Sequence, residues 1–326
     1  MGPIRPFKVT RLGNAIRQVT CLLVSAVCLS APGWPQDNST TFKVNVRLVR
    51  LLATVKDANG ALIGSLNKSD FTVTDNGVPQ DIAVFDRQTE QPLSVAVLVD
   101  TSASTGIEIR YELDSVRKFF RALLEEGNPR DTAALFSFNW QVTVESNFTR
   151  RFAKLDSQLK QLRSEGGTSL YDAIFLVSRR LELRDETRHV MVIVTDGGDT
   201  TSIKNYHQAL EAAQIADVIM YPVLVMPITN DAGRNIGGEN ALTTLSAGTG
   251  RRVFTPAAAA ELDRAFVDIL RELRTQYLIG YYPKDVPPSR DRFHTLKVNV
   301  RGRNLRVLTR SGYYGESNES TNGLGR

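Results

Sequence analysis

The feature that most constrains the fold is an alternation of apolar runs and amphipathic segments in the middle of the chain. Three runs are almost continuously apolar, at residues 93–99, 190–194 and 218–225. Such runs are typical of strands that are buried on both faces, as in a parallel sheet covered by helices. Further strands are expected at 132–138, 142–144 and 252–254.

Segments with an apolar residue at every third or fourth position separate these strands, which is the period of an amphipathic helix. The expected helices are 106–126, 152–162, 170–183, 206–216, 242–246 and 258–274. Because strands and helices alternate, residues 92–275 are predicted to form an α/β domain with a doubly wound, mostly parallel sheet.

The segments on either side, 42–91 and 276–314, show only the period of β-strands. Strands are expected at 42–55, 71–74, 82–85, 277–282, 294–300 and 305–309, with a hairpin-type turn at Asp75-Asn76-Gly77. Neither flank is large enough for a core of its own. We therefore predict that both flanks pair into one small β domain, with the α/β domain inserted in it, since domain termini commonly lie close together.

The first 33 residues resemble a secretory signal peptide. A basic region without acids precedes an apolar run at 19–29 and small residues before Trp34. This run is shorter than the about 20 residues that a membrane span needs. We expect an exported protein, periplasmic or extracellular, with no transmembrane span in the mature chain. An uncleaved signal, or a lipid on Cys28, would instead leave it associated with the envelope.

Two short segments complete the organisation of the chain. Residues 34–41 are polar and are expected to be a linker, and the polar, glycine-rich residues 315–326 are expected to be a disordered tail.

Composition excludes several classes of function. The chain has a net charge of +5, but the first 33 residues hold four basic residues and no acid, which leaves about +1 and weakens the case for nucleic acid. Both cysteines lie in the same segment, so the mature chain has neither a disulfide nor a cysteine metal site. No nucleotide-binding loop or nucleophile motif occurs, and we expect no enzyme. The histidines are too widely spaced for zinc: His189, His207 and His294.

Two of the apolar runs end in an aspartate, at Asp100 and Asp196. Ligand sites of open α/β sheets lie at the carboxyl ends of the strands, so these carboxylates should meet at one edge. Ser102 and Ser104 follow the first aspartate, and Thr168 lies in a loop before a predicted helix. Two carboxylates and three hydroxyls suit a hard divalent cation. Mg²⁺ is the expected ion, with Mn²⁺ and Ca²⁺ as alternatives.

Two further acids lie near this set in the sequence. Asp199 follows Asp196 closely, as an outer-shell candidate or a solvated loop residue. Asp172 is spaced from Ser169 as a helix capping box, and we expect that structural role for it.

The pattern D-x-S-x-S, a later threonine and T-D-G resembles the metal-ion-dependent adhesion site of von Willebrand factor A domains, over about residues 92–275. The resemblance implies that Ser102, Ser104 and Thr168 coordinate the ion directly or through water. It implies that the aspartates act mainly through water or on the ion's direct ligands, and that a Glu or Asp of a partner completes the octahedron. Ala103 stands where many members have glycine.

Several pieces outside that region resemble an exported family related to von Willebrand factor A domains that is abundant in acidobacteria. They include Asp70-Phe71, Tyr281-Tyr282-Pro283 and Arg310-Ser311-Gly312-Tyr313-Tyr314, so this resemblance covers about residues 42–314. It supplies no established biochemical activity.

The sequence therefore predicts an exported, metal-dependent protein-binding module of the adhesion type. The partner is an unidentified protein that offers a Glu or Asp, and the oligomeric state stays open. One alternative is a hydrolase that uses the same ion as a Lewis acid, with Asp199 as the nearest candidate base. Another is a structural envelope component in which the ion only stabilises the fold.

Overall fold

The computed structural model describes residues 48–87, 91–103, 109–184, 186–225, 236–287, 289, 291–302 and 304–315. They all belong to one compact unit, Val46–Arg326. The expected signal, the linker, the start of the first strand and nearly all of the tail lie outside these ranges. Among the described residues, no helix is both long enough and apolar enough to cross a membrane.

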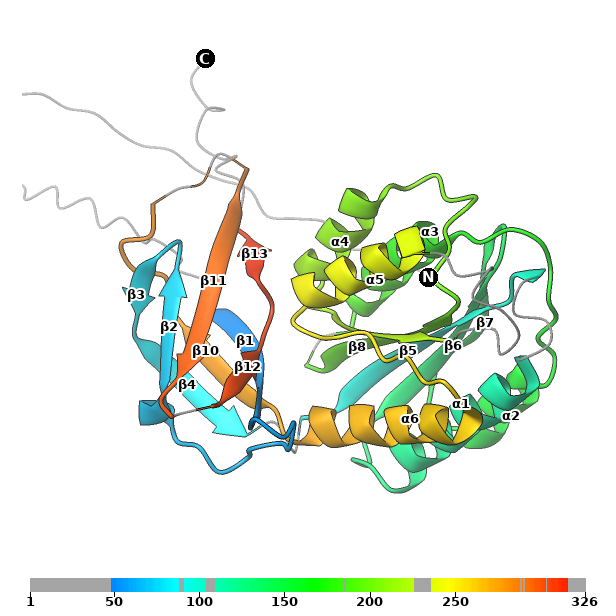
Figure 1. Ribbon diagram of the computed structural model, residues 1–326, viewed down its shortest axis with the longest axis horizontal. Helices are drawn as coiled ribbons and strands as arrows, with labels where there is room; N and C mark the ends of the chain where they lie inside the picture. The colour runs from blue at the N-terminus through cyan, green and yellow to red at the C-terminus, as the bar shows by residue number, and fades with distance from the viewer. Residues whose placement is uncertain are drawn as a thin grey trace, which may run out of the picture. The chain divides into compact units, whose positions relative to one another are not determined.

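A five-stranded sheet in the order β7-β6-β5-β8-β9 forms the centre of the α/β part (Figure 1). Four of its strands are parallel and β7 pairs antiparallel with β6 at one edge. The strands are β5 (Leu93–Asp100), β6 (Thr132–Phe138), β7 (Val142–Thr149), β8 (Arg188–Thr195) and β9 (Ile219–Leu224). The prediction of a doubly wound, mostly parallel sheet is confirmed.

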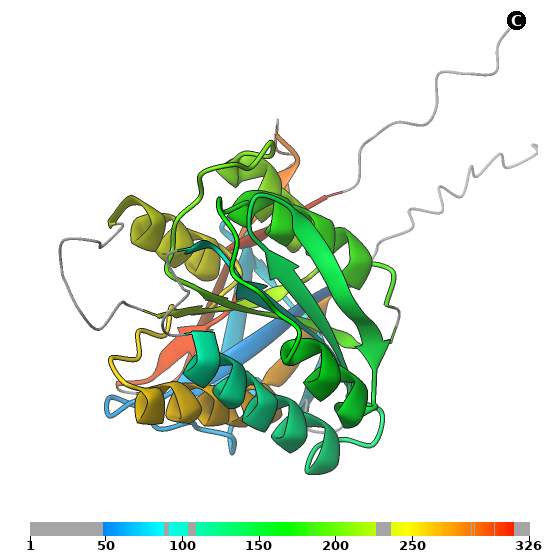
Figure 2. The same ribbon diagram turned by 90° about the vertical axis from the view of Figure 1, so that its right-hand side faces the viewer.

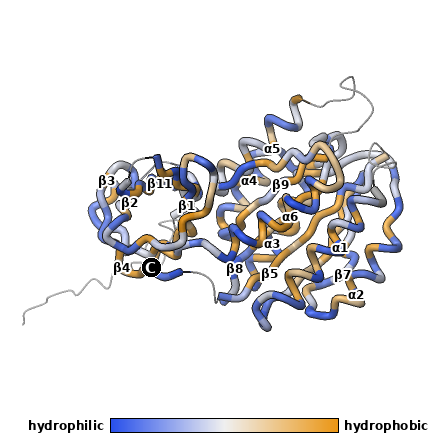
Figure 3. The backbone as a smooth tube through the Cα atoms, turned by 60° about the horizontal axis from the view of Figure 1, so that its bottom comes forward, coloured by the Kyte–Doolittle hydropathy of each residue, from blue (hydrophilic) through white to orange (hydrophobic). Residues whose placement is uncertain are grey.

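Helices cover both faces of this sheet (Figures 1 and 2). Alternate residues of β5 point to opposite faces, so Val97 packs in one apolar cluster and Leu98 in the other. Figure 3 shows the apolar stretch of the chain along β5. The first cluster includes α1 (Ile109–Glu125), α2 (Phe152–Leu159) and α6 (Ala259–Arg274). The second includes α3 (Leu170–Leu181), α4 (Tyr206–Ile215) and α5 (Ile236–Gly248).

Three elements of the α/β part differ from the sequence prediction, and one of them is β7, which runs to Thr149 although a strand was expected only at 142–144. Helix α5 begins at Ile236, before the expected 242–246, because its first turn is glycine-rich and polar and shows no apolar period. The strand expected at 252–254 is reduced to a single bridge between Val223 and Phe254.

The remaining strands form two antiparallel sheets, β12-β1-β10-β4 and β13-β11-β2-β3. Both sheets contain strands from both flanks, which confirms that the flanks pair around the α/β part. Apolar residues from the two sheets share one core. The elements are β1 (Val49–Lys56), a 3-10 helix (Lys68–Asp70), β2 (Phe71–Asp75), β3 (Val78–Gln80), β4 (Ile82–Arg87), β10 (Tyr277–Tyr281), β11 (Phe293–Val300), β12 (Arg306–Leu308) and β13 (Gly312–Tyr314).

The pairing partners were harder to predict than the strands themselves. Asn76 and Gly77 have φ values of 46° and 83°, as a two-residue hairpin turn with both central residues left-handed requires. The turn joins β2 to the short β3, however, and β4 pairs with β10 in the other sheet. Likewise β12 pairs with β1 and β11 with β2 and β13. The short β13 was not predicted.

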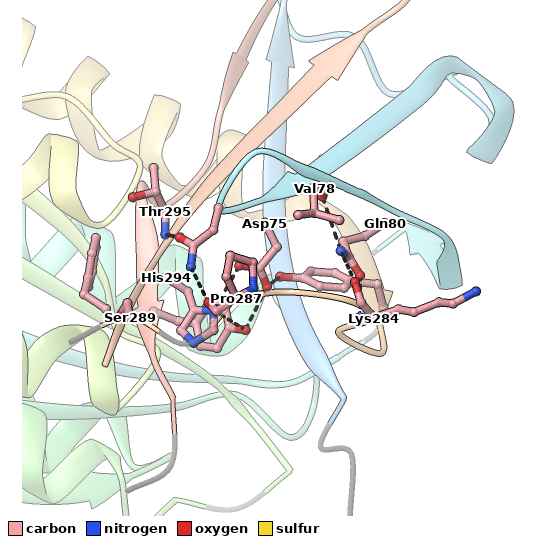
Figure 4. A network of polar contacts seen from close by, with 12 residues as sticks. Asp75, Val78, Gln80, Lys284, Pro287, Ser289, His294 and Thr295 are labelled. Carbon is pink, nitrogen blue, oxygen red and sulfur yellow. Dashed lines mark hydrogen bonds and ion pairs between the residues drawn. The ribbon is translucent and has the colours of Figure 1, made fainter. Parts of the chain in front are cut away.

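A buried carboxylate links the two sheets of the β part. Asp75 Oδ2 accepts hydrogen bonds from the phenols of Tyr281 (2.7 Å) and Tyr313 (2.8 Å), and Oδ1 lies 3.0 Å from His294 Nδ1 (Figure 4). Burial, followed by the hydrogen bond to Asp75, raises the pKa of both phenols well above the ordinary value. Both tyrosines therefore remain donors at neutral pH, and the cluster joins β2, β10, β11 and β13.

A chain truncated after Gln276 should lose the folded β part, because β1 loses both β10 and β12 and β2 loses β11, keeping the short β3. Limited trypsin digestion with mass spectrometry should show rapid cleavage within residues 48–87 and slow cleavage within the α/β part. Continued protection of residues 48–87 in the truncated chain would contradict the assignment of one β domain made of both flanks.

Asp75→Ala should lower the free energy of unfolding by about 3 kcal/mol, because it leaves buried phenol donors without their acceptor. Urea unfolding monitored by tyrosine fluorescence and circular dichroism measures this difference. The exposed Asp81 provides the control, since Asp81→Ala removes a carboxylate without a buried partner. Equal effects of the two substitutions would show that the cluster contributes no stability.

Candidate metal site

The two aspartates of the predicted site lie at the carboxyl ends of neighbouring parallel strands. Asp100 is the last residue of β5 and is fully buried, and Asp196 directly follows β8. The chain first builds the sheet outward from β5 through β6, and then returns to add β8 on the other side of β5. The point where the strand order reverses is where open α/β sheets bind ligands.

Asp100 accepts hydrogen bonds from the segment that follows its own strand and from the end of β8. Its Oδ1 accepts from the backbone N–H of Ser102 at 2.8 Å, and its Oδ2 accepts from Thr195 Oγ1 at 2.6 Å. Burial raises the pKa of Asp100 to about 6, with a further rise from the charge of Asp196, although the hydrogen bonds from Thr195 and Ser102 oppose it. A cation at this place would favour the charged carboxylate.

Ser102 and Thr168 lie on loops that contact each other and the loop after β8. Ser102 is buried and forms a parallel bridge with Glu165, whose N–H donates to Thr101 O at 2.8 Å. Thr168 is also buried, and its carbonyl accepts from the N–H groups of Thr200 and Thr201. The structure thus gathers Asp100, Ser102, Thr168 and Asp196 at one edge of the sheet.

The fifth predicted residue, Ser104, lies outside the described residues. Its participation therefore stays a prediction, as does the role of the whole set as ligands.

The loop after β8 is fixed by contact with the start of α5. Gly197 has a φ of +95°, which favours glycine, and Gly238 packs directly against it. A Cβ atom at position 238 would lie 1.5 Å from the carbonyl oxygen of Gly197, so only glycine fits there. Sequence reasoning missed this part of the site; the adjacent pair Gly237-Gly238 was the available signal.

The two neighbouring acids hold loops in place. Asp199 Oδ1 accepts from Tyr171 N at 3.2 Å and from Ser202 Oγ at 2.6 Å, and its outer-shell role stays a prediction. The expected capping box is wrong. Asp172 accepts from the N–H groups of residues 203 and 204, and the Ser169 hydroxyl donates to Asn139 O. Tertiary partners have replaced the local hydrogen bonds of the cap.

The chemistry of the gathered residues fits a hard divalent ion. They offer carboxylate and hydroxyl oxygens, and Mg²⁺ is typically held by one or two carboxylates with water in its remaining positions. Within the described residues there is no group of three or more His, Cys, Asp and Glu side chains that could hold a metal. The carboxylate and hydroxyl oxygens suit Mg²⁺ better than Zn²⁺, which takes nitrogen and sulfur ligands.

Comparison with known families finds a match to the segment that carries these residues. The profile of the von Willebrand factor type A domain matches residues 95–198, from β5 to the loop after β8. The match spans both aspartates and the loop of Thr168. Together with the strand order, it shows that the α/β part is a von Willebrand factor type A domain. None of the curated proteins matches the chain.

Several solved structures are similar to the chain at low identity. The vWF domain of the type V pili tip protein Mfa5 from Porphyromonas gingivalis is 15% identical, with a TM-score of 0.48, over 56% of this chain and 95% of that one. BatB from Bacteroides thetaiotaomicron is 15% identical, with a TM-score of 0.43, over 55% and 98%. The PilB minor pilin from Streptococcus sanguinis is 13% identical, with a TM-score of 0.47, over 58% and 62%.

Mg²⁺ should raise the melting temperature of the wild-type protein, because an ion that binds only the folded state stabilises it. At a free concentration of 100 times the Kd, the gain is about 2.7 kcal/mol. Differential scanning fluorimetry with Mg²⁺ and with chelator measures the shift.

Asp100→Asn and Asp196→Asn should abolish this shift. Asp268→Asn is the matched control, since Asp268 is a half-exposed acid of α6 that pairs with Arg271 of the same helix. A shift that survives in Asp100→Asn, or vanishes equally in Asp268→Asn, would contradict the site.

Proposed function

We propose that this chain is an exported protein-binding module of the adhesion type, in which a divalent ion captures a Glu or Asp of a partner protein. The ion would be held by Asp100, Ser102, Ser104, Thr168 and Asp196. The main support is the gathering of two carboxylates and two hydroxyl side chains at the switch point of a von Willebrand factor type A fold.

The donor set explains why the ion would bind a carboxylate of a partner protein. Hydroxyls are neutral, so the two aspartates supply the negative charge of the site. The two carboxylates would at most balance the two positive charges of the ion, and Mg²⁺ prefers six oxygen ligands. A partner carboxylate would replace one of the waters and complete the octahedron.

The hydrolase alternative receives no support from the described geometry. Such an enzyme needs a general base within reach of the metal-bound water. The nearest candidate is Asp199, but its Oδ1 already accepts two hydrogen bonds that hold the start of α3 and its own loop. Binding therefore accounts for the arrangement better than hydrolysis does.

Export is part of the same proposal and is supported by the first 33 residues alone. Their basic region, apolar run and small residues are typical of a secretory signal. A periplasmic or extracellular location would present the site to partners of the cell envelope.

Purified wild-type protein should capture a partner from envelope extract in Mg²⁺ and release it on chelation, and Asp100→Ala should capture at least about tenfold less. Quantitative mass spectrometry of the captured proteins measures this. Asp268→Ala serves as the control because the half-exposed carboxylate of Asp268 pairs with Arg271 on α6. Capture that is equal with chelator would refute the mechanism, and a thermal shift without any Mg²⁺-dependent capture would favour the structural alternative.

A further inference from the structure

Three strongly exposed apolar side chains lie around the candidate metal site, two of them on loops and one at the start of α5. Trp140 is 57% exposed, Ile203 is 91% exposed and Ile236 is 64% exposed. They are three of the five most exposed large apolar side chains among the described residues. Single exposed apolar residues are ordinary, but several on the rim of one site indicate a binding surface. We call these three residues the apolar rim.

Trp140 is placed by contacts with the loops of Ser102 and Thr168. Its backbone N–H donates to Gly166 O at 3.1 Å, and a Cβ on Gly167 would lie 2.9 Å from Trp140 Cβ. Its indole Nε1–H donates to Glu165 Oε2 at 3.1 Å, and Glu165 is the residue bridged to Ser102. The indole is thus held in place beside the site while more than half of it stays exposed.

Ile203 belongs to the loop that follows β8 and passes the site. Its N–H donates to Asp172 Oδ2 at 3.0 Å, which fixes its backbone on the start of α3. In the same loop, Thr200 and Thr201 donate to the carbonyl of Thr168. A fully exposed isoleucine on a fixed backbone adds apolar surface without contributing to the core.

Ile236 is the first residue of α5 and lies two residues before Gly238, which packs on Gly197. The apolar rim therefore comes from two loops and the start of α5, and each of these is joined by a contact to a candidate ligand or to its immediate neighbour. The two loops are the one after β6 and the one after β8.

We infer that the apolar rim binds the residues on either side of the captured carboxylate, so that the partner offers a single Glu or Asp flanked by apolar side chains. This inference rests on the proposed function, because the ion supplies the central contact. Apolar contacts around the carboxylate would exclude water and so strengthen the contact between ion and acid. Tryptophan at the centre of an interface is often the residue that contributes most to affinity.

The charges near the rim distinguish this partner from other occupants. The exposed carboxylate of Glu165 lies beside Trp140 and would repel a second acid close to the first. The same carboxylate disfavours anionic lipid and the phosphates of nucleic acid. The structure therefore favours one acid in an apolar setting over an acidic stretch.

Selection from a displayed library of random 12-residue peptides tests the inference. The full chain is used as bait in Mg²⁺, with counter-selection on Asp100→Ala. We expect enriched peptides to contain one Glu or Asp with Trp, Phe, Leu, Ile or Met at adjacent positions. The most enriched peptide is then synthesised together with a version in which those apolar neighbours are serine, and both affinities are measured by calorimetry.

The apolar version should bind at least about tenfold more tightly to wild type, and Trp140→Ser with Ile203→Ser should remove most of that preference. Leu183→Ser is the matched control, because Leu183 is 80% exposed and lies near Arg184, which contacts Ser94 at the opposite end of β5. An unchanged thermal shift with Mg²⁺ in the double variant would show that its site is still folded.

Each other outcome is decisive. Enrichment of acids without apolar neighbours, or equal affinities of the two synthetic peptides, overturns the inference and leaves the proposed function standing. Binding of apolar peptides that is insensitive to chelator overturns the proposed function. No enrichment over the counter-selection overturns both. Concentration-dependent dimerisation that is lost in the double variant would assign the rim to a second copy of this chain and overturn the inference.

Discussion

The complete burial of β5 is the constraint on which the rest of the structure depends. All eight of its residues are buried between β6 and β8 and between helices on both faces. A strand that is apolar on both faces needs a sheet that is covered on both sides, and this requirement determines the α/β architecture. The same burial raises the pKa of the last residue of the strand, Asp100, whose charged form the proposed cation would favour.

Much of the fold follows from local patterns in the sequence. The apolar run of β5 and the helical period of α1, α3 and α6 identify the α/β layer, because burial on one face or both leaves a direct mark on residue type. The pairing of β4 with β10 and of β12 with β1 could not be predicted. Short strands carry little information about their partners, and the choice depends on contacts between residues more than 180 positions apart. The start of α5 was missed because glycine disfavours a helix, and Gly238 is there because of its close contact with Gly197.

The candidate site shows a similar division. Asp100, Ser102, Thr168 and Asp196 could be found from sequence because strand ends and oxygen donors are readable one residue at a time. The supporting contacts could not, since the hydrogen bonds of Asp172 and Asp199 join α3 to the loop after β8. The apolar rim could not be predicted either, because it also depends on contacts between separate segments. The sequence does not tell whether a tryptophan is exposed or buried. Only the structure shows that Trp140 is exposed and that Glu165, which is bridged to Ser102, holds the indole of Trp140 in place.

The position of β1 between β12 and β10 has a consequence for the order in which the protein is made. The first described strand leaves the ribosome more than 200 residues before its neighbours. Until then its apolar residues, such as Leu51 and Val55, have no sheet to enter. The inserted domain contains all the strands and helices of its own core and can fold while the remaining residues are still being added. The β domain is therefore completed last, when the final strands pair with β1. The apolar residues of β1 become buried only once these C-terminal strands have been made.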